Sequence, residues 1–171
     1  MSLSMHQASV PALQQILGSL SALIDKAAAH CEARKIDPAT LIGYRLAPDM
    51  FAFARQIQIT TDQAKGIAAR LAGVEIPKLP DTETTFDELK ARLAKVSDFI
   101  GSLPAAQFDG SETRAITMKL AGQDVSFTGT NYLFGFGLPN FYFHASTAYD
   151  ILRHAGVPIG KRDFLGAVPA Q

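Results

Sequence analysis

Apolar residues recur at three- and four-residue steps along three stretches of the chain, a pattern that predicts helices burying one face. In the first stretch the stripe persists for about three heptads, which is typical of a helix packed lengthwise in a bundle. The three stripes consist of Val10, Leu13, Leu17, Leu20, Ile24, Ala27 and Cys31, then Met50, Phe53, Ile57, Ala64, Ile67 and Leu71, then Phe86, Leu89, Leu93, Val96, Ile100 and Leu103.

Polar residues and glycines next to these stripes indicate where the helices begin and end. We expect Ser9 to cap the N-terminus of the first helix. The second helix is expected to begin near Asp49, because its carboxylate would interact favourably with the positive N-terminal end of the helix dipole. Gly73 is the expected residue after the second helix. Thr85 and Glu88 have the spacing of a capping box, which places the start of the third helix directly after Thr85.

The period changes to two over residues 116–128, which predicts a small hairpin whose apolar face lies against the helices. A fourth helix is expected over residues 131–155, with a break near Pro139, and residues 74–84 read as an irregular crossing. The prediction is an all-α fold: an antiparallel four-helix bundle with a small β-hairpin between helices three and four. It forms one domain over residues 1–171, with the tail 157–171 packed on it.

Charge and composition exclude several classes of partner. The 16 basic and 16 acidic side chains balance, and no basic cluster indicates binding to nucleic acid or to a membrane surface. One cysteine, no signal peptide and no uninterrupted apolar span predict a soluble, cytoplasmic protein with no membrane partner.

His144 is the polar residue that stands out, because it falls on the apolar stripe of the fourth helix. A buried imidazole is costly unless it is hydrogen-bonded or coordinated, so His144 is either a satisfied core residue or a metal ligand or general base. We expect its ring to be mostly buried and within direct or water-bridged reach of Gln56 or Asp49. Asn140, one turn earlier, and His6, at the start of the first helix, complete the predicted mixed nitrogen and oxygen pocket.

Several segments resemble a bacterial family of uncharacterised proteins in the DinB/YfiT-like superfamily of four-helix bundles. The resemblance covers nearly the whole chain. The segments are 45–50, 56–58, 70–73, 81–84, 88–89, 138–144, 147–149, 151–154 and 160–166.

Membership of this superfamily implies a fold, and in many members a divalent metal held by one histidine of the second helix and a His-x-x-x-His pair of the fourth. Some members use the metal in thiol-dependent transferase chemistry. His144 matches the first histidine of the pair, but Ala148 and Gln56 occupy the other two positions. We therefore expect no metal. Any metal would need His144 together with His6 or Asp49.

Three functions follow as hypotheses. The first is binding of a small molecule in an inter-helix pocket lined by His144 and Gln56, with the superfamily metal site degenerate. The second is a divalent-metal-dependent enzyme, and the third is a self-associating structural module. We also expect a homodimer, because the aromatic residues of the fourth helix cannot all face one core. These residues are Phe134, Phe136, Phe141, Tyr142 and Phe143.

Overall fold

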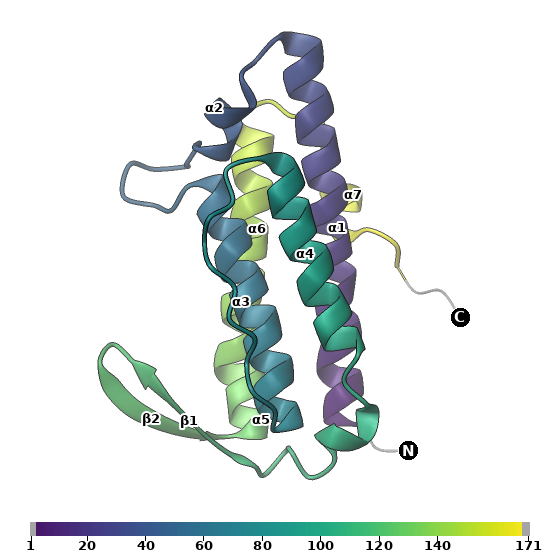
Figure 1. Ribbon diagram of the computed structural model, residues 1–171, viewed down its shortest axis with the longest axis vertical. Helices are drawn as coiled ribbons and strands as arrows, with labels where there is room; N and C mark the ends of the chain where they lie inside the picture. Colours follow the sequence, from purple (N-terminus) through teal and green to yellow (C-terminus); the bar gives the residue numbers. More distant parts are fainter. Residues whose placement is uncertain (1–2, 169–171) are drawn as a thin grey trace.

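The computed structural model describes residues 3–168, and most of them are helical (Figure 1). In chain order the elements are α1 (Met5–Arg34), α2 (Pro38–Ile42), α3 (Phe53–Ala72), α4 (Phe86–Gly101), the 3-10 helix η1 (Ala105–Phe108), β1 (Ala115–Leu120), β2 (Gln123–Thr128), α5 (Gly129–Tyr132), the π-helix η2 (Leu133–Gly137), α6 (Leu138–His154) and α7 (Lys161–Leu165). None of these helices combines the length and the apolar character of a membrane span.

Four long helices, α1, α3, α4 and α6, lie side by side around one apolar core (Figure 1). α1 packs against α4, and α3 packs against α6. Both pairs are antiparallel, because the residue number on one helix falls as the number on its partner rises. The contacts are Gln14–Ser97 and Asp25–Lys90 in the first pair, and Gln56–His144 and Ile67–Gly137 in the second.

The chain between α3 and α4 runs back along the bundle before α4 begins (Figure 1). As a result α3 and α4 run in the same direction: Phe53 packs on Phe86 near the start of both helices, with ring centroids 6.4 Å apart. The predicted irregular crossing is therefore the segment that sets the bundle's topology. The predicted helical bundle with a small hairpin before the last long helix is confirmed.

The first helix begins earlier than the sequence predicted. Ser4, not Ser9, is its N-cap, and it exchanges two 3.1 Å hydrogen bonds with Gln7 in a capping box. Ser9 is buried inside the helix, where its hydroxyl donates to the carbonyl oxygen of Met5 at 2.7 Å. Pro11 consequently lies inside the helix, on its exposed face.

The second long helix begins later than predicted, at Phe53 rather than near Asp49. Arg45 explains the delay, because its guanidinium donates to the carbonyl oxygens of Pro48 at 3.3 Å and Met50 at 3.2 Å and so holds this segment in a turn. Asp49 is an exposed residue of that turn and caps no helix.

The remaining boundaries agree with the sequence. Thr85 and Glu88 form the predicted capping box of α4, and Gly73 follows α3 with a φ of 72°. The predicted break before Pro139 takes the form of η2, a π-helical segment between α5 and α6. Bulges of this kind are a recognised way to bend a long helix.

The hairpin packs on the bundle through one face, which carries Ile116, Met118 and Phe127. Ile116 is its one buried residue, and Phe127 packs on Tyr132 and Phe136 with ring centroids 6.2 and 6.1 Å away. Ala121 and Gly122 make the tight turn with φ angles of 48° and 84°, and the tip projects away from the helices (Figure 1). The predicted packing of the hairpin's apolar face on the bundle is therefore confirmed for Ile116, Met118 and Phe127, and it does not extend to the tip.

After α6 the chain returns to the bundle. Val157 and Ile159 are buried, and α7 packs on α1. Phe164 stacks edge-on to Tyr149 with centroids 5.7 Å apart. The last three residues of the predicted tail, 169–171, lie outside the described residues.

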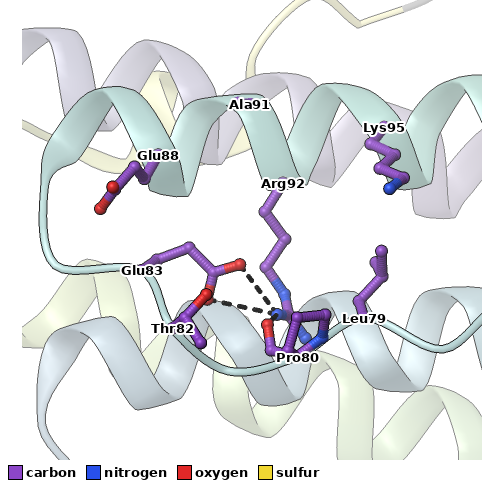
Figure 2. Close-up of a pocket in the computed structure, with 8 residues that line it drawn as sticks. All are labelled: Leu79, Pro80, Thr82, Glu83, Glu88, Ala91, Arg92 and Lys95. Atoms are coloured by element: carbon purple, nitrogen blue, oxygen red, sulfur yellow. Dashed lines mark hydrogen bonds and ion pairs between the residues drawn. The ribbon is translucent and has the colours of Figure 1, made fainter.

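Arg92 of α4 fixes the crossing segment in place (Figure 2). Its side chain is 2% exposed, and every nitrogen of the guanidinium has a partner. Nε donates to Thr61 at 2.6 Å, one terminal nitrogen contacts the Pro80 carbonyl oxygen and the Glu83 carboxylate at 3.0 Å, and the other contacts two aspartates at 2.9 Å. The two aspartates are Asp62 of α3 and Asp81 of the crossing segment.

We expect Arg92→Met to destabilise the protein strongly. Removing one partner of a buried ion cluster leaves its carboxylates uncompensated, a loss of about 3–5 kcal/mol when they are fully buried. Asp62 and Asp81 are about one third exposed and can regain hydration. We therefore expect about 3 kcal/mol, measured as the free energy of unfolding in urea.

Lys90→Met is the matched control, because Lys90 lies on the same helix and pairs with Asp25 at the surface. Its loss should cost less than about 1 kcal/mol. Equal stability of the two variants would contradict the role given to Arg92.

Candidate functional site

The candidate site is the edge of the α3–α6 pair, where His144 meets Gln56. His144 lies in the second turn of α6 and Gln56 in the first turn of α3. Nδ1 of His144 and Oε1 of Gln56 are 2.7 Å apart. Gln56 is 1% exposed, and His144 is partly buried and in direct contact with Gln56, as predicted. One edge of the imidazole therefore faces the protein and the other is accessible.

The hydrogen bonds of Gln56 determine which imidazole nitrogen carries the proton. Its Nε2 donates to the Phe51 carbonyl oxygen at 3.2 Å, so its Oε1 must be the acceptor toward His144. In the neutral ring Nδ1 is then the donor, and Nε2 is left with a free lone pair. His144 thus presents a hydrogen-bond acceptor, or a base, on its accessible side.

The surroundings also keep this imidazole neutral. Burial, and after it the positive charge of Arg55, lower the pKa of the His144 imidazole below its usual range. Arg55 is itself held by Gln58 at 3.3 Å and by an ion pair with Asp81. The charge network of the crossing segment therefore reaches the histidine through Arg55.

Aromatic side chains stand exposed around the pair. Phe143 packs edge-on to the His144 ring with centroids 5.1 Å apart, and it is 58% exposed. Phe51 is 55% exposed, and the Arg55 guanidinium lies 5.9 Å from the centroid of its ring. Apolar rings beside a free acceptor suit a ligand with an aromatic body and one polar donor.

Of the other predicted site residues, one lies next to His144 on α6 and two lie elsewhere. Asn140 lies one turn before His144 on the same side of α6 and is half-buried. Asp49 is exposed in the turn before α3 and does not join the pair, because α3 begins after it. His6 packs edge-on to Phe108 of η1, with centroids 5.0 Å apart, at the end of the bundle where α1 begins.

The residues present do not fit the superfamily metal. The amide of Gln56 is committed to Phe51 and to His144, and Ala148 is fully buried with no ligand atom to offer. Among residues 3–168, no group of three or more His, Cys, Asp or Glu side chains is placed to hold a metal ion. A divalent metal bound by protein normally needs three convergent ligands, and His144 supplies one.

Sequence reasoning missed Arg55 and Arg92. Arg92 carried a signal, since it lies on the stripe formed with Leu89 and Val96, where a charge requires buried partners.

Cys31 is buried, and burial followed by the charge of Asp37 raises the pKa of its thiol, which is opposite to what a nucleophile needs.

Comparison with known proteins supports the fold and the resemblance. The chain superimposes on the crystal structure of a DinB family member protein from Shewanella denitrificans with a TM-score of 0.91 and 40% sequence identity, over 97% of this chain and 94% of that one. The fold and this likeness define a DinB-like helical protein. Residues 5–165 match the model of a domain of unknown function, DUF1993, and the chain belongs to that family. A search of curated proteins gave no match.

The lowered pKa of His144 predicts a pH dependence of stability. The unfolded chain takes up a proton near the usual histidine pKa of about 6.5, whereas the folded state does so only at lower pH. The unfolded state therefore binds more protons in this window. The stability that the neutral His144 contributes is fully present above about pH 6.5. It is lost as the pH falls toward the pKa of His144 in the folded state.

His144→Gln removes the titration but keeps an amide that can donate to Gln56. We expect the unfolding free energy of the wild type to fall more than that of this variant between about pH 7.5 and about pH 5. The difference between the two proteins isolates His144 from the other three histidines. Parallel curves would show that His144 is not held neutral in the folded state.

Proposed function

We propose that this protein binds a small aromatic molecule with one hydrogen-bond donor at the edge of the α3–α6 pair. The observation that carries the proposal is the fixed orientation of His144, whose Nδ1 is engaged by Gln56 at 2.7 Å. Nε2 of His144 accepts from the ligand's donor, and Phe143 contacts the aromatic body. Asn140 offers a further polar group one turn away.

A binding role agrees with the chemistry of the site better than metal-dependent catalysis does. The neutral imidazole is held by a buried amide rather than by a carboxylate, so no charged partner stabilises an imidazolium. Arg55 adds positive charge nearby, which also opposes protonation. The imidazole is thus suited to accept a hydrogen bond and to keep its neutral form while doing so.

Phenol is a suitable probe, and toluene is its control without a donor. We expect phenol to shift the Nε2 resonance of His144 in nitrogen-15 NMR of the imidazole, and toluene to leave that resonance in place. Phe143→Ala should weaken phenol binding by about 0.5–1.5 kcal/mol, the usual value of an aromatic contact. Phe134→Ala is the matched control, because Phe134 is 52% exposed and lies in η2, away from His144. Equal binding of phenol and toluene, or an unmoved Nε2 signal, would refute the proposal.

Self-association is a second candidate, favoured by the exposed aromatic residues. Phe141 is fully buried, and Phe136 is partly covered by Phe127 of the hairpin. Phe134 and Phe143 remain more than half exposed. Exposed apolar patches of this kind mark interfaces, and twofold dimers are the commonest closed assembly.

Light scattering at micromolar concentration tests the homodimer. We expect twice the chain mass of 18.4 kDa for the wild type and a single chain mass for Phe143→Asp, since a buried charge opposes the contact. A wild-type mass of one chain would rule out the dimer. If the dimer covers Phe143, phenol should shift the equilibrium toward the monomer.

A further inference from the structure

A second candidate binding site lies between α4 and the crossing segment, on the side where Arg92 is buried. A crevice of about 240 Å³ is lined by Lys65, Pro77, Leu79, Lys95, Val96 and Phe99. It shares Leu79 and Lys95 with the neighbouring cavity of about 280 Å³ (Figure 2). These two residues therefore mark the boundary between an apolar crevice and a polar one.

The interior of the smaller crevice is apolar despite its two lysines. Four of its lining residues, Pro77, Leu79, Val96 and Phe99, have hydrocarbon side chains. Lys65 is buried and its ammonium pairs with Asp62 at 2.8 Å, so it contributes its methylene stem to the wall. Such a surface favours a hydrocarbon group over water.

Lys95 is the cation that is free to bind an anion at the boundary. It is exposed and forms no ion pair with any residue in the described range 3–168. Arg92 cannot serve, because all of its nitrogens are engaged by the crossing segment and α3. Figure 2 shows the Lys95 side chain extending from α4 toward Leu79.

We propose that this crevice binds an apolar monocarboxylate, with its hydrocarbon tail against Val96 and Phe99 and its carboxylate on Lys95. A buried cavity of about 150 Å³ holds benzene, so 240 Å³ corresponds to about ten non-hydrogen atoms. A single free lysine matches one negative charge. The carboxylates of Glu83 and Glu88 in the neighbouring cavity disfavour a more highly charged head group.

Octanoate has the required size and charge, and its binding can be measured by calorimetry at low salt. We expect a weak but saturable interaction, and about fivefold weaker binding of octan-1-ol, which has the same tail without the charge. Lys95→Met should weaken octanoate binding about fivefold and leave octan-1-ol binding unchanged. Lys78→Met is the matched control, because this exposed lysine is in the crossing segment but does not line the crevice.

A blocking variant tests the location of the tail. Leu79→Trp, at a half-buried position of the crossing segment, should abolish binding of both ligands while the melting temperature shows that the protein is folded. His144→Gln should leave octanoate binding unchanged, since that site is on the α6 side of α3. The proposal is overturned if octanoate does not bind, if octan-1-ol binds as tightly as octanoate, or if Lys95→Met and Lys78→Met have equal effects.

Discussion

The buried guanidinium of Arg92 is the constraint on which the arrangement of the helices depends. A cation with a 2% exposed side chain must have all of its donors satisfied, and its partners come from α3 and from the crossing segment. No arrangement in which the crossing segment leaves the bundle can supply them. The segment is therefore held along the helices, α4 starts beside the start of α3, and the two helices run in parallel.

This arrangement gives α3 neighbours on most sides and explains why so many of its polar residues are buried. On the side toward α4, Thr61 accepts a hydrogen bond from Arg92 and Lys65 pairs with Asp62. On the side toward α6, Gln56 forms a hydrogen bond with His144. Arg55 links the two sides, because it pairs with Asp81 of the crossing segment and its charge adds to the larger effect of burial in lowering the pKa of His144. Variants of the charge network should thus be felt at the histidine even though Arg92 does not touch it.

The sequence predicted the elements that depend on local signals, namely the apolar stripes, the capping box at Thr85, the glycine after α3 and the break before Pro139. It failed where one particular side-chain contact, whether near or distant in the sequence, decided the outcome, as in the capping of α1 by Ser4 and Gln7. The turn that excludes Asp49 from α3 depends on Arg45, and His6 meets Phe108 rather than His144 because the bundle end closes over it. The Gln56–His144 pair could be anticipated, since both residues border apolar stripes and the family resemblance aligned them. The partners of Arg92 could not, because Asp62, Asp81 and Glu83 come together only when the crossing segment folds back.

Gln56 and Ala148 occupy positions at which the family resemblance implies metal ligands, so the proposed site differs from a metal site in what it can bind. The neutral amide of Gln56 orients the imidazole through a hydrogen bond to Nδ1. In a metal site, a hydrogen-bond partner of the metal-bound histidine would orient the ring in the same way. The lone pair of Nε2 then faces an accessible edge bordered by Phe143 instead of converging with other ligands. Because the buried alanine adds no polar group, the α3–α6 contact keeps its apolar packing and its polar chemistry is confined to that edge. The proposed function therefore places an uncharged donor at the accessible edge of His144, where the family resemblance would have implied a metal ion.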